Sequence, residues 1–317
     1  MTKEEKNLQN AMTEGVIWKQ LLLFFFPIVL GTFFQQLYNT ADAIIVGKFV
    51  GKEALAAVGG TTGTLINLLV GFFVGLSSGA SVIISQFFGA RRPDDVSRAV
   101  HTTMALALAS GAALTVLGIW SSRAVLVMMG TPEDVLGHAV TYINIYFMGM
   151  IPSLIYNIGS GILRAVGDSR RPLFFLISAT MTNIVLDVVF MKYLRTGVAG
   201  AAAASLLGNA AGILVVLPYL LSKKRTFRFV LRAGDLRETG RELASSCSSF
   251  ATDKASRIFS GLTVNLLLMY FVGNIGVALY AVYSQLRFIL RILAGGALQT
   301  ISTLGSMLYG ERDFYGL

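Results

Sequence analysis

Long apolar stretches, separated by short charged segments, constrain this chain more than any other feature. They run over residues 20–47, 54–89, 99–122, 136–163, 173–191, 197–221, 245–272 and 277–309. Each stretch approaches or exceeds the ~20 residues that an α-helix needs to cross a bilayer. The stretches are rich in Leu and Ala and do not alternate with polar residues, which disfavours strands. The sequence therefore predicts an all-α, polytopic membrane protein with eight transmembrane helices.

The distribution of charge supports this prediction and sets an orientation. Only 14% of the residues are charged, whereas soluble domains have about 25%. The net charge of +9 would suggest a nucleic-acid partner in a soluble protein. Here, seventeen Lys and Arg residues fall on one side of the predicted topology and five on the other. The positive-inside rule then predicts a cytoplasmic N-terminus in the plasma membrane, and it replaces nucleic acid with the lipid bilayer as the expected partner.

Several functional classes are disfavoured by what the sequence lacks. Cys247 is the only cysteine, so an intrachain disulfide cannot form. No Gly-x-x-x-x-Gly-Lys-Ser/Thr phosphate loop occurs, so we expect neither ATP hydrolysis nor a bound cofactor, and we do not expect an enzyme. The segment 1–19 has no small-residue cleavage site, so the first apolar stretch is expected to stay in the protein.

A pattern in the second apolar stretch recurs in the eighth. Its Gly75, Ser81, Phe88-Gly89 and Arg91 reappear 221 residues later as Gly296, Ser302, Tyr309-Gly310 and Arg312. A repeat of this length indicates two lobes that begin alike and point the same way across the membrane. We therefore expect a six-helix N-lobe over 1–221, a basic linker over 222–244 and the first two helices of a C-lobe over 245–317.

Three carboxylates interrupt the apolar stretches: Asp42, Asp187 and Asp253. An acid at the centre of a membrane helix costs about 3 kcal/mol and is functional by default. Thr180 and Asn183 share a helix face with Asp187, and Gln35 and Tyr38 share one with Asp42. Where two such faces meet, their oxygens can hold a proton or a cation.

The alternative is an ordinary ion pair for each acid. Asp42 lies six residues before Lys48, and Asp187 lies five before Lys192. Pairing at the membrane interface would leave both acids without a function.

The order of motifs resembles the multidrug and toxic compound extrusion (MATE) transporters. The matching stretches cover most of the chain: Pro27-Ile-Val-Leu-Gly31, Asn39-Thr-Ala-Asp42, Gln86-Phe-Phe-Gly89, Leu163-Arg-Ala-Val-Gly-Asp-Ser-Arg-Arg-Pro172, Asn183-Ile-Val-Leu-Asp187 and Gly197-Val-Ala-Gly-Ala. The resemblance implies a V-shaped, alternating-access antiporter that exports small organic compounds, often cationic or amphiphilic, against an inward flow of H⁺ or Na⁺.

The resemblance also implies roles for individual residues. The ion or proton site maps onto Asp42, Asn183 and Asp187, where Na⁺ could bind, with Asn157, Thr180 and Ser205 as further polar groups. Pro27 matches the proline whose bending would couple the ion to substrate release, although an ordinary kink is the alternative. Gln35, Tyr38 and Arg287 are candidates for the substrate cleft. No structural metal is expected.

The chain is shorter than the members of this family, and its length leaves other functions open. MATE transporters have twelve helices, so we expect this chain to be truncated after the eighth and to lack four helices that transport would require. The alternatives are a flippase for lipid-linked precursors of the same superfamily, or a non-transporting fragment that assembles with a partner.

Overall fold

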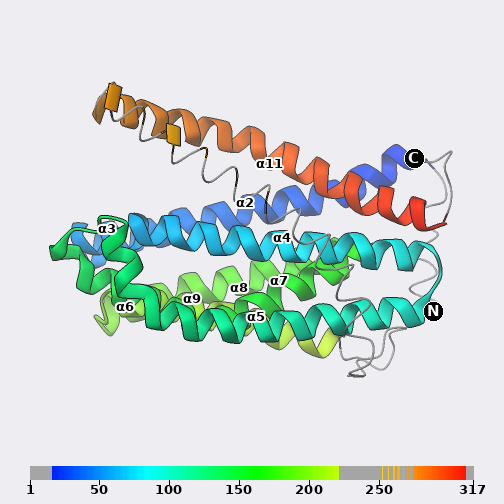
Figure 1. Cartoon of the computed structure of the whole chain (residues 1–317), viewed down its shortest axis with the longest axis horizontal. Helices are drawn as coiled ribbons and strands as arrows, with labels where there is room; N and C mark the ends of the chain where they lie inside the picture. Colours follow the sequence, from blue (N-terminus) through cyan, green and yellow to red (C-terminus); the bar gives the residue numbers. More distant parts are fainter. Residues whose placement is uncertain are drawn as a thin grey trace.

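The computed structural model describes residues 16–220 and 274–311, with a few isolated positions between 252 and 271. Long helices joined by short turns make up these residues (Figure 1). In chain order they are α2 (Ile17–Phe49), α3 (Lys52–Gly59), α4 (Thr61–Gly89), α5 (Pro93–Met128), α6 (Glu133–Met148), α7 (Met150–Ala165), α8 (Arg170–Val188), the π-helical turn η1 (Val189–Tyr193), α9 (Val198–Leu220) and α11 (Asn274–Glu311). No strand occurs among the described residues, which confirms the predicted all-α class.

Most of the predicted membrane spans are present. Five helical segments are long and apolar enough to cross a bilayer: Trp18–Phe49, Glu53–Gly89, Pro93–Met128, Arg170–Tyr193 and Val198–Val216. The eighth predicted stretch, 277–309, lies within α11. The linker 222–244 lies outside the described residues, as do Asp253 and most of the seventh stretch, 245–272.

The predicted span over 136–163 is present as a helix pair with a bend. This stretch forms two helices, α6 and α7, which are bent by 51° relative to each other. The break falls at Gly149, three residues before Pro152. Pro152 has no backbone N–H to donate to the carbonyl of Met148, and its ring occupies the space of that carbonyl, so a helix cannot continue through this point undisturbed.

Apolar side chains fill the centre of the bundle and also cover its outside. Phe73 and Ile84 of α4 and Leu154 of α7 are fully buried in the main core. On α5, by contrast, Val116 and Trp120 are exposed by 69% and 85%. In a membrane protein this outer apolar surface faces lipid, which is the expected solvent for it.

A ladder of serines joins α4 to α7. The hydroxyls of Ser77, Ser81 and Ser85 lie 3.0, 3.1 and 3.1 Å from the carbonyl oxygens of Asn157, Gly161 and Ala165. Those of Ser81 and Ser85 are shared with carbonyl oxygens of α4 itself, on Ser77 and Ser81, at 2.8 and 2.6 Å. Their spacing of four residues places all three on one face of α4. A Cβ at Gly161 would collide with the Ser77 Oγ, so the glycine allows the approach on which the ladder depends. We call these six residues the serine ladder.

Helix α11 contacts the rest of the structure along its C-terminal half. Gly296 lies against Val29 and Phe25 of α2, and Leu304 and Met307 are buried in the main core. Before this point most of the described side chains are exposed, with Leu290 at 68% and Leu293 at 48%, and Ile292 is half-buried. Figure 1 shows the same divergence: α11 moves away from α2 and α4 towards its N-terminus.

Candidate functional site

Asp42 of α2 and Asp187 of α8 come together inside the bundle. Asp42 is 7% exposed and Asp187 is fully buried. The two carboxyl groups are close enough to interact directly, because α2 and α8 pack side by side. The predicted meeting of the two acidic helix faces is therefore present in the structure.

Ser205 of α9 connects both acidic helices. Its Oγ lies 3.2 Å from the Tyr38 hydroxyl of α2, and the Asn183 Nδ2 of α8 donates to it at 3.4 Å. Asn183 and Ser205 are buried, at 3% and 6% exposure. We refer to Tyr38, Asp42, Asn183, Asp187 and Ser205 together as the aspartate site.

Four buried oxygen atoms in this site have no hydrogen-bond donor among the described residues. They are Asp42 Oδ1, Asn183 Oδ1 and both carboxylate oxygens of Asp187. A buried oxygen without a partner costs roughly 1–3 kcal/mol, and more when it is charged. Their gathering at one place is therefore the arrangement expected of a site that takes up a proton or a cation.

The alternative ion pairs with lysine are not formed. The Lys48 ammonium lies over the ring of Phe49 at 5.9 Å, and that of Lys192 over the ring of Tyr193 at 5.3 Å. Neither lysine forms a salt bridge to Asp42 or Asp187 in the described part of the chain, and both Asp187 oxygens are unpartnered. The two acids are thus not neutralised by neighbouring basic residues of their own helices.

The other predicted ion-site residues lie at different distances from this centre. Thr180 is buried on α8, on the same face as Asn183. Asn157 lies on α7, where its Nδ2 donates to the Ser153 carbonyl at 2.7 Å and its own carbonyl accepts from Ser77. The contacts described for Asn157 therefore belong to the serine ladder rather than to the aspartate site.

The predicted hinge and cleft residues are less closely tied to the site. Pro27 lies half-buried inside α2, which continues as one helix on both sides of it. Gln35 is exposed, whereas Tyr38 reaches Ser205. Arg287 lies on α11, and its side chain is outside the described residues.

Two tyrosines of α6 join the aspartate site without having been predicted as part of it. Tyr142 is close enough to Asp42, Asp187 and Tyr38 for electrostatic interaction, and Tyr146 is similarly close to Tyr38 and Tyr142. Their spacing of four residues places both tyrosines on one helix face. This spacing is the feature of the sequence that could have indicated their place in the site.

An apolar layer closes the site on one side. Tyr142 packs with Val46 of α2, Met191 of η1 and Ala201 of α9 in a separate buried cluster. The π-helical turn η1 begins two residues after Asp187. Turns of this kind inside α-helices are frequently found at functional sites.

Comparison with known proteins relates this chain to one family and to multidrug resistance proteins. A family model described as MatE matches residues 27–189. The chain is 26% identical over 320 residues to a probable multidrug resistance protein of Bacillus subtilis, YoeA, and covers 69% of its length. A second Bacillus subtilis relative, the probable multidrug resistance protein YpnP, is 32% identical over 67% of this chain, which corresponds to 47% of the relative.

The fold agrees with solved structures as well. A multidrug resistance transporter solved in an outward-facing conformation superposes with a TM-score of 0.90 and 26% identity. The match covers all of this chain and 69% of that one.

Proposed function

Because the chain belongs to the MATE family of multi-pass membrane transporters, we propose that it is the ion-binding part of an antiporter that exports organic compounds. The family transports compounds and is not one of enzymes. The substrates proposed are small organic molecules of cationic or amphiphilic character, and the membrane is the plasma membrane, with the Arg91 end of the bundle on the cytoplasmic side.

The four unpartnered oxygens of the aspartate site carry this proposal. Two neighbouring carboxyl groups in a low-dielectric interior do not both stay ionised unless a counter-charge neutralises them. A proton shared by Asp42 and Asp187 meets this requirement. So does Na⁺ bound by the carboxylates with the Asn183 Oδ1, since hard cations prefer oxygen ligands.

Helix α2 provides the mechanical link between ion and cargo. It bears Asp42 and Tyr38 in the aspartate site, and one end of it touches the second half of the chain where Val29 and Phe25 meet Gly296. Pro27 lies between these two contact residues. Because a proline interrupts the helical hydrogen bonds, α2 can bend there when occupancy of the site changes its interactions with α8 and α9.

The direction of access follows from the arrangement of α11. It packs on α2 and α4 at the Arg91 end and diverges from them at the other. The solved relative with a TM-score of 0.90 is described as outward-facing. Both observations support an outward-facing arrangement in which the aspartate site receives its ion from outside.

A flippase for lipid-linked precursors is not favoured by the described residues. Such a cargo carries phosphates and would need a cationic cavity. Arg291 is exposed on α11, and the side chain of Arg287, the other basic candidate on this helix, lies outside the described residues. The proposal therefore keeps organic compounds as the cargo.

The ion-site assignment is tested with Asp187→Asn. We expect this variant to lose coupled counterflow of a fluorescent dye in vesicles under either a pH or a Na⁺ gradient. Asp134→Asn, on an exposed turn of α6, removes a carboxylate outside the site and should behave as the parent. If Asp187→Asn exports the dye as well as the parent at equal gradients, the assignment is wrong.

A binding experiment makes the same test without transport. In weakly buffered detergent, the parent should take up protons or, by calorimetry, bind Na⁺, and Asp187→Asn should do neither. Unchanged proton uptake and unchanged Na⁺ heat in the variant would contradict the proposal even in a chain that transports nothing.

A further inference from the structure

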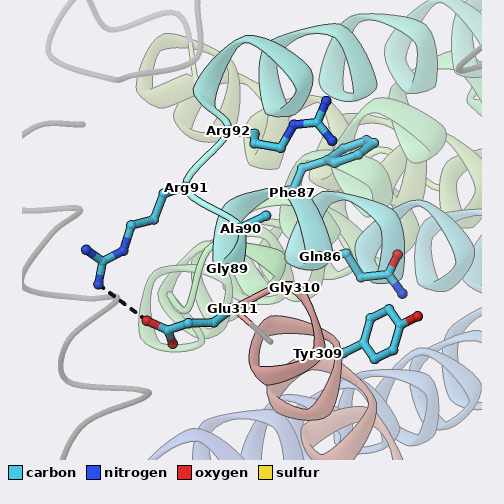
Figure 2. A pocket seen from close by; sticks show the side chains of 9 residues that line it. All are labelled: Gln86, Phe87, Gly89, Ala90, Arg91, Arg92, Tyr309, Gly310 and Glu311. Atoms are coloured by element: carbon cyan, nitrogen blue, oxygen red, sulfur yellow. Dashed lines mark hydrogen bonds and ion pairs between the residues drawn. The ribbon is translucent and has the colours of Figure 1, made fainter. Parts of the chain in front are cut away.

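Helices α4 and α11 cross at two glycines near their C-terminal ends. The backbone of Gly89 lies against the carbonyl oxygen of Met307, and Gly310 lies against the carbonyl oxygen of Gln86. Figure 2 shows Gly89 and Gly310 where the two helices meet. A Cβ at either glycine would collide with the opposite carbonyl. We call these four residues the glycine crossing.

The crossing joins the two copies of the sequence repeat. Gln86 and Met307 are 221 residues apart, and so are Gly89 and Gly310. Each half of the chain therefore supplies one glycine and one carbonyl, and the same position in both copies makes the same contact. Close approach of this kind is favourable for helices in lipid, because it combines van der Waals contact with weak Cα–H···O contacts between glycine and carbonyl.

Arg91 adds one polar contact beside the crossing. Its guanidinium lies 3.3 Å from the Glu311 carboxylate of α11. Arg91 has a φ of 57°, in the left-handed region. The backbone N–H of Arg91 donates to the Phe88 carbonyl, and that of Arg92 donates to the Phe87 carbonyl. These two bonds form the helix end that usually has glycine at the position occupied here by Arg91.

The residue chosen at this helix end is unusual. The described positive-φ positions are otherwise glycines, with the exception of Arg195. An L-residue in the left-handed region costs about 1 kcal/mol relative to glycine. At Arg91 this cost places a positive charge next to the second half of the chain, which a glycine could not do.

A hollow of about 670 Å³ adjoins the crossing. It is lined by Gln86, Phe87, Gly89, Ala90, Arg91, Arg92, Tyr309, Gly310 and Glu311. Figure 2 shows Arg91 and Glu311 at one side of it and Gln86 and Tyr309 at another. Water can thus reach the helix ends next to the contact, which lowers the cost of separating them.

We propose that the glycine crossing is the closing contact of a gate between the two halves of the chain, and that the ion pair between Arg91 and Glu311 is its releasable latch. In this state the gate is shut at the Arg91 end, while α11 diverges from α2 and α4 at the opposite end. The proposal rests on the alternating-access function given above, because a gate that never opens would have no role.

The strength of the latch fits this role. Both side chains reach solvent, with exposures of 60% for Arg91 and 26% for Glu311. Exposed ion pairs contribute little, and losing one changes an equilibrium by no more than about fivefold. A latch of this size biases the gate towards closure without preventing the opening that each transport cycle needs.

Distances between spin labels test the proposal directly. Cys247→Ser removes the native thiol, and labels on Asp94→Cys and Tyr309→Cys then report on the two halves across the gate. Both positions are exposed. A second pair, Asp94→Cys with Arg170→Cys, lies at exposed positions of the first half alone and serves as the control.

Charge changes at the latch should move only the first pair. Glu311→Lys places two positive charges together, so we expect the long-distance population to rise about fivefold or more, and Glu311→Gln to raise it about twofold. The exchange Arg91→Glu with Glu311→Arg should restore the short distance. The control pair should not change in any of these variants.

Two glycines of α11 give a matched test of the crossing. Gly310→Ala puts a methyl group onto the Gln86 carbonyl, whereas a Cβ at Gly295 meets nothing within 4 Å. We therefore expect Gly310→Ala to leave little of the short-distance population and Gly295→Ala to leave it unchanged.

The proposal is overturned if the charge reversal and Gly310→Ala leave the gate distance as in the parent, or if the control pair lengthens equally. These measurements need neither ion nor substrate. Failure of the gate therefore shows in the label distances, and failure of the proposed antiport shows in the ion binding of Asp187→Asn.

Discussion

Helix α4 makes two close contacts of different character, one on α7 and one on α11. Towards α7, three serine hydroxyls each reach a backbone carbonyl, two of them while also bonded within α4, and Gly161 permits the approach. Towards α11, glycine meets carbonyl, and the polar contact described between the two helices is the exposed pair of Arg91 and Glu311. The same helix is thus tied to its own half by hydrogen bonds and to the other half by packing.

The difference bears on the proposed movement of the two halves relative to each other. Interhelical hydrogen bonds in a membrane have no water to replace them, so separating α4 from α7 would lose the bond from Ser77 and the shared bonds from Ser81 and Ser85. Separating the glycine crossing would expose Leu304 and Met307 of α11, which are buried in the main core, beside a hollow that is open to solvent. The contact with α11 borders the hollow and an exposed ion pair, and for this reason the proposed gate is assigned to it.

The largest expected effect comes from filling the space at Gly161. Gly161→Val would force a side chain into Ser77 and Ser81, and overpacking of this kind costs about 3 kcal/mol of unfolding free energy. Thermal unfolding in detergent measures it. Gly137→Val, where a Cβ meets nothing within 4 Å, should stay near the parent; equal unfolding temperatures for both variants would contradict the tight α4 to α7 contact.

Removing the hydroxyls of the ladder should have a somewhat smaller effect. Replacing Ser77, Ser81 and Ser85 together by Ala removes three interhelical bonds worth about 0.6 kcal/mol each. A pair of control replacements, Ser110→Ala and Ser121→Ala on α5, removes hydroxyls that bond only within their own helix. If the triple variant is no less stable than these controls, the ladder does not hold the half together.

Arg91→Gly should change the stability little, since two effects oppose each other. The glycine relieves the left-handed conformation, while the ion pair to Glu311 is lost. Each effect is of the order of 1 kcal/mol or less, so the unfolding temperature should stay close to that of the parent. A large loss of stability would show that Arg91 supports the fold and not only the contact between the halves.

Salt should have the smallest effect and should act on one contact alone. At about 1 M salt the Debye length falls to about 3 Å, so the exposed pair of Arg91 and Glu311 is screened. The label distance across the gate should lengthen by less than the Glu311→Gln variant produces, and thermal stability should not fall. If salt lengthens the label distance equally in Glu311→Gln and in the parent, the ion pair is not the contact that salt weakens.

Much of the fold could be predicted from the sequence because a bilayer allows few solutions. Apolar length alone located the helices around 20–47, 99–122 and 173–191 within a few residues of α2, α5 and the α8–η1 segment. It could not show that 136–163 bends at Gly149. The bend comes from the helical hydrogen bond that Pro152 cannot make, and a hydropathy value does not include this effect. Apolar length also gave no sign of η1, because a π-helical turn depends on how neighbouring helices pack.

The aspartate site was predictable where helix periodicity and burial agree. The spacing of Asn183 and Asp187 identified one acidic face, and the cost of burying Asp42 identified the other. Tyr142 was not assigned to the site, because its approach depends on the bend between α6 and α7. Asn157 was assigned to it from the family resemblance, and the contacts described for it are those of the ladder.

The glycine crossing has the form of an isologous interface, in which position 86 of one copy meets position 310 of the other and position 307 meets position 89. Two identical half-length chains would make such a contact around a twofold axis, and every ion pair beside it would occur twice or not at all. In this chain the repeat counterpart of Glu311 is Ala90, and that of Arg91 is Arg312. Joining the halves in one polypeptide has thus allowed a single, one-sided ion pair that a symmetric homodimer could not encode.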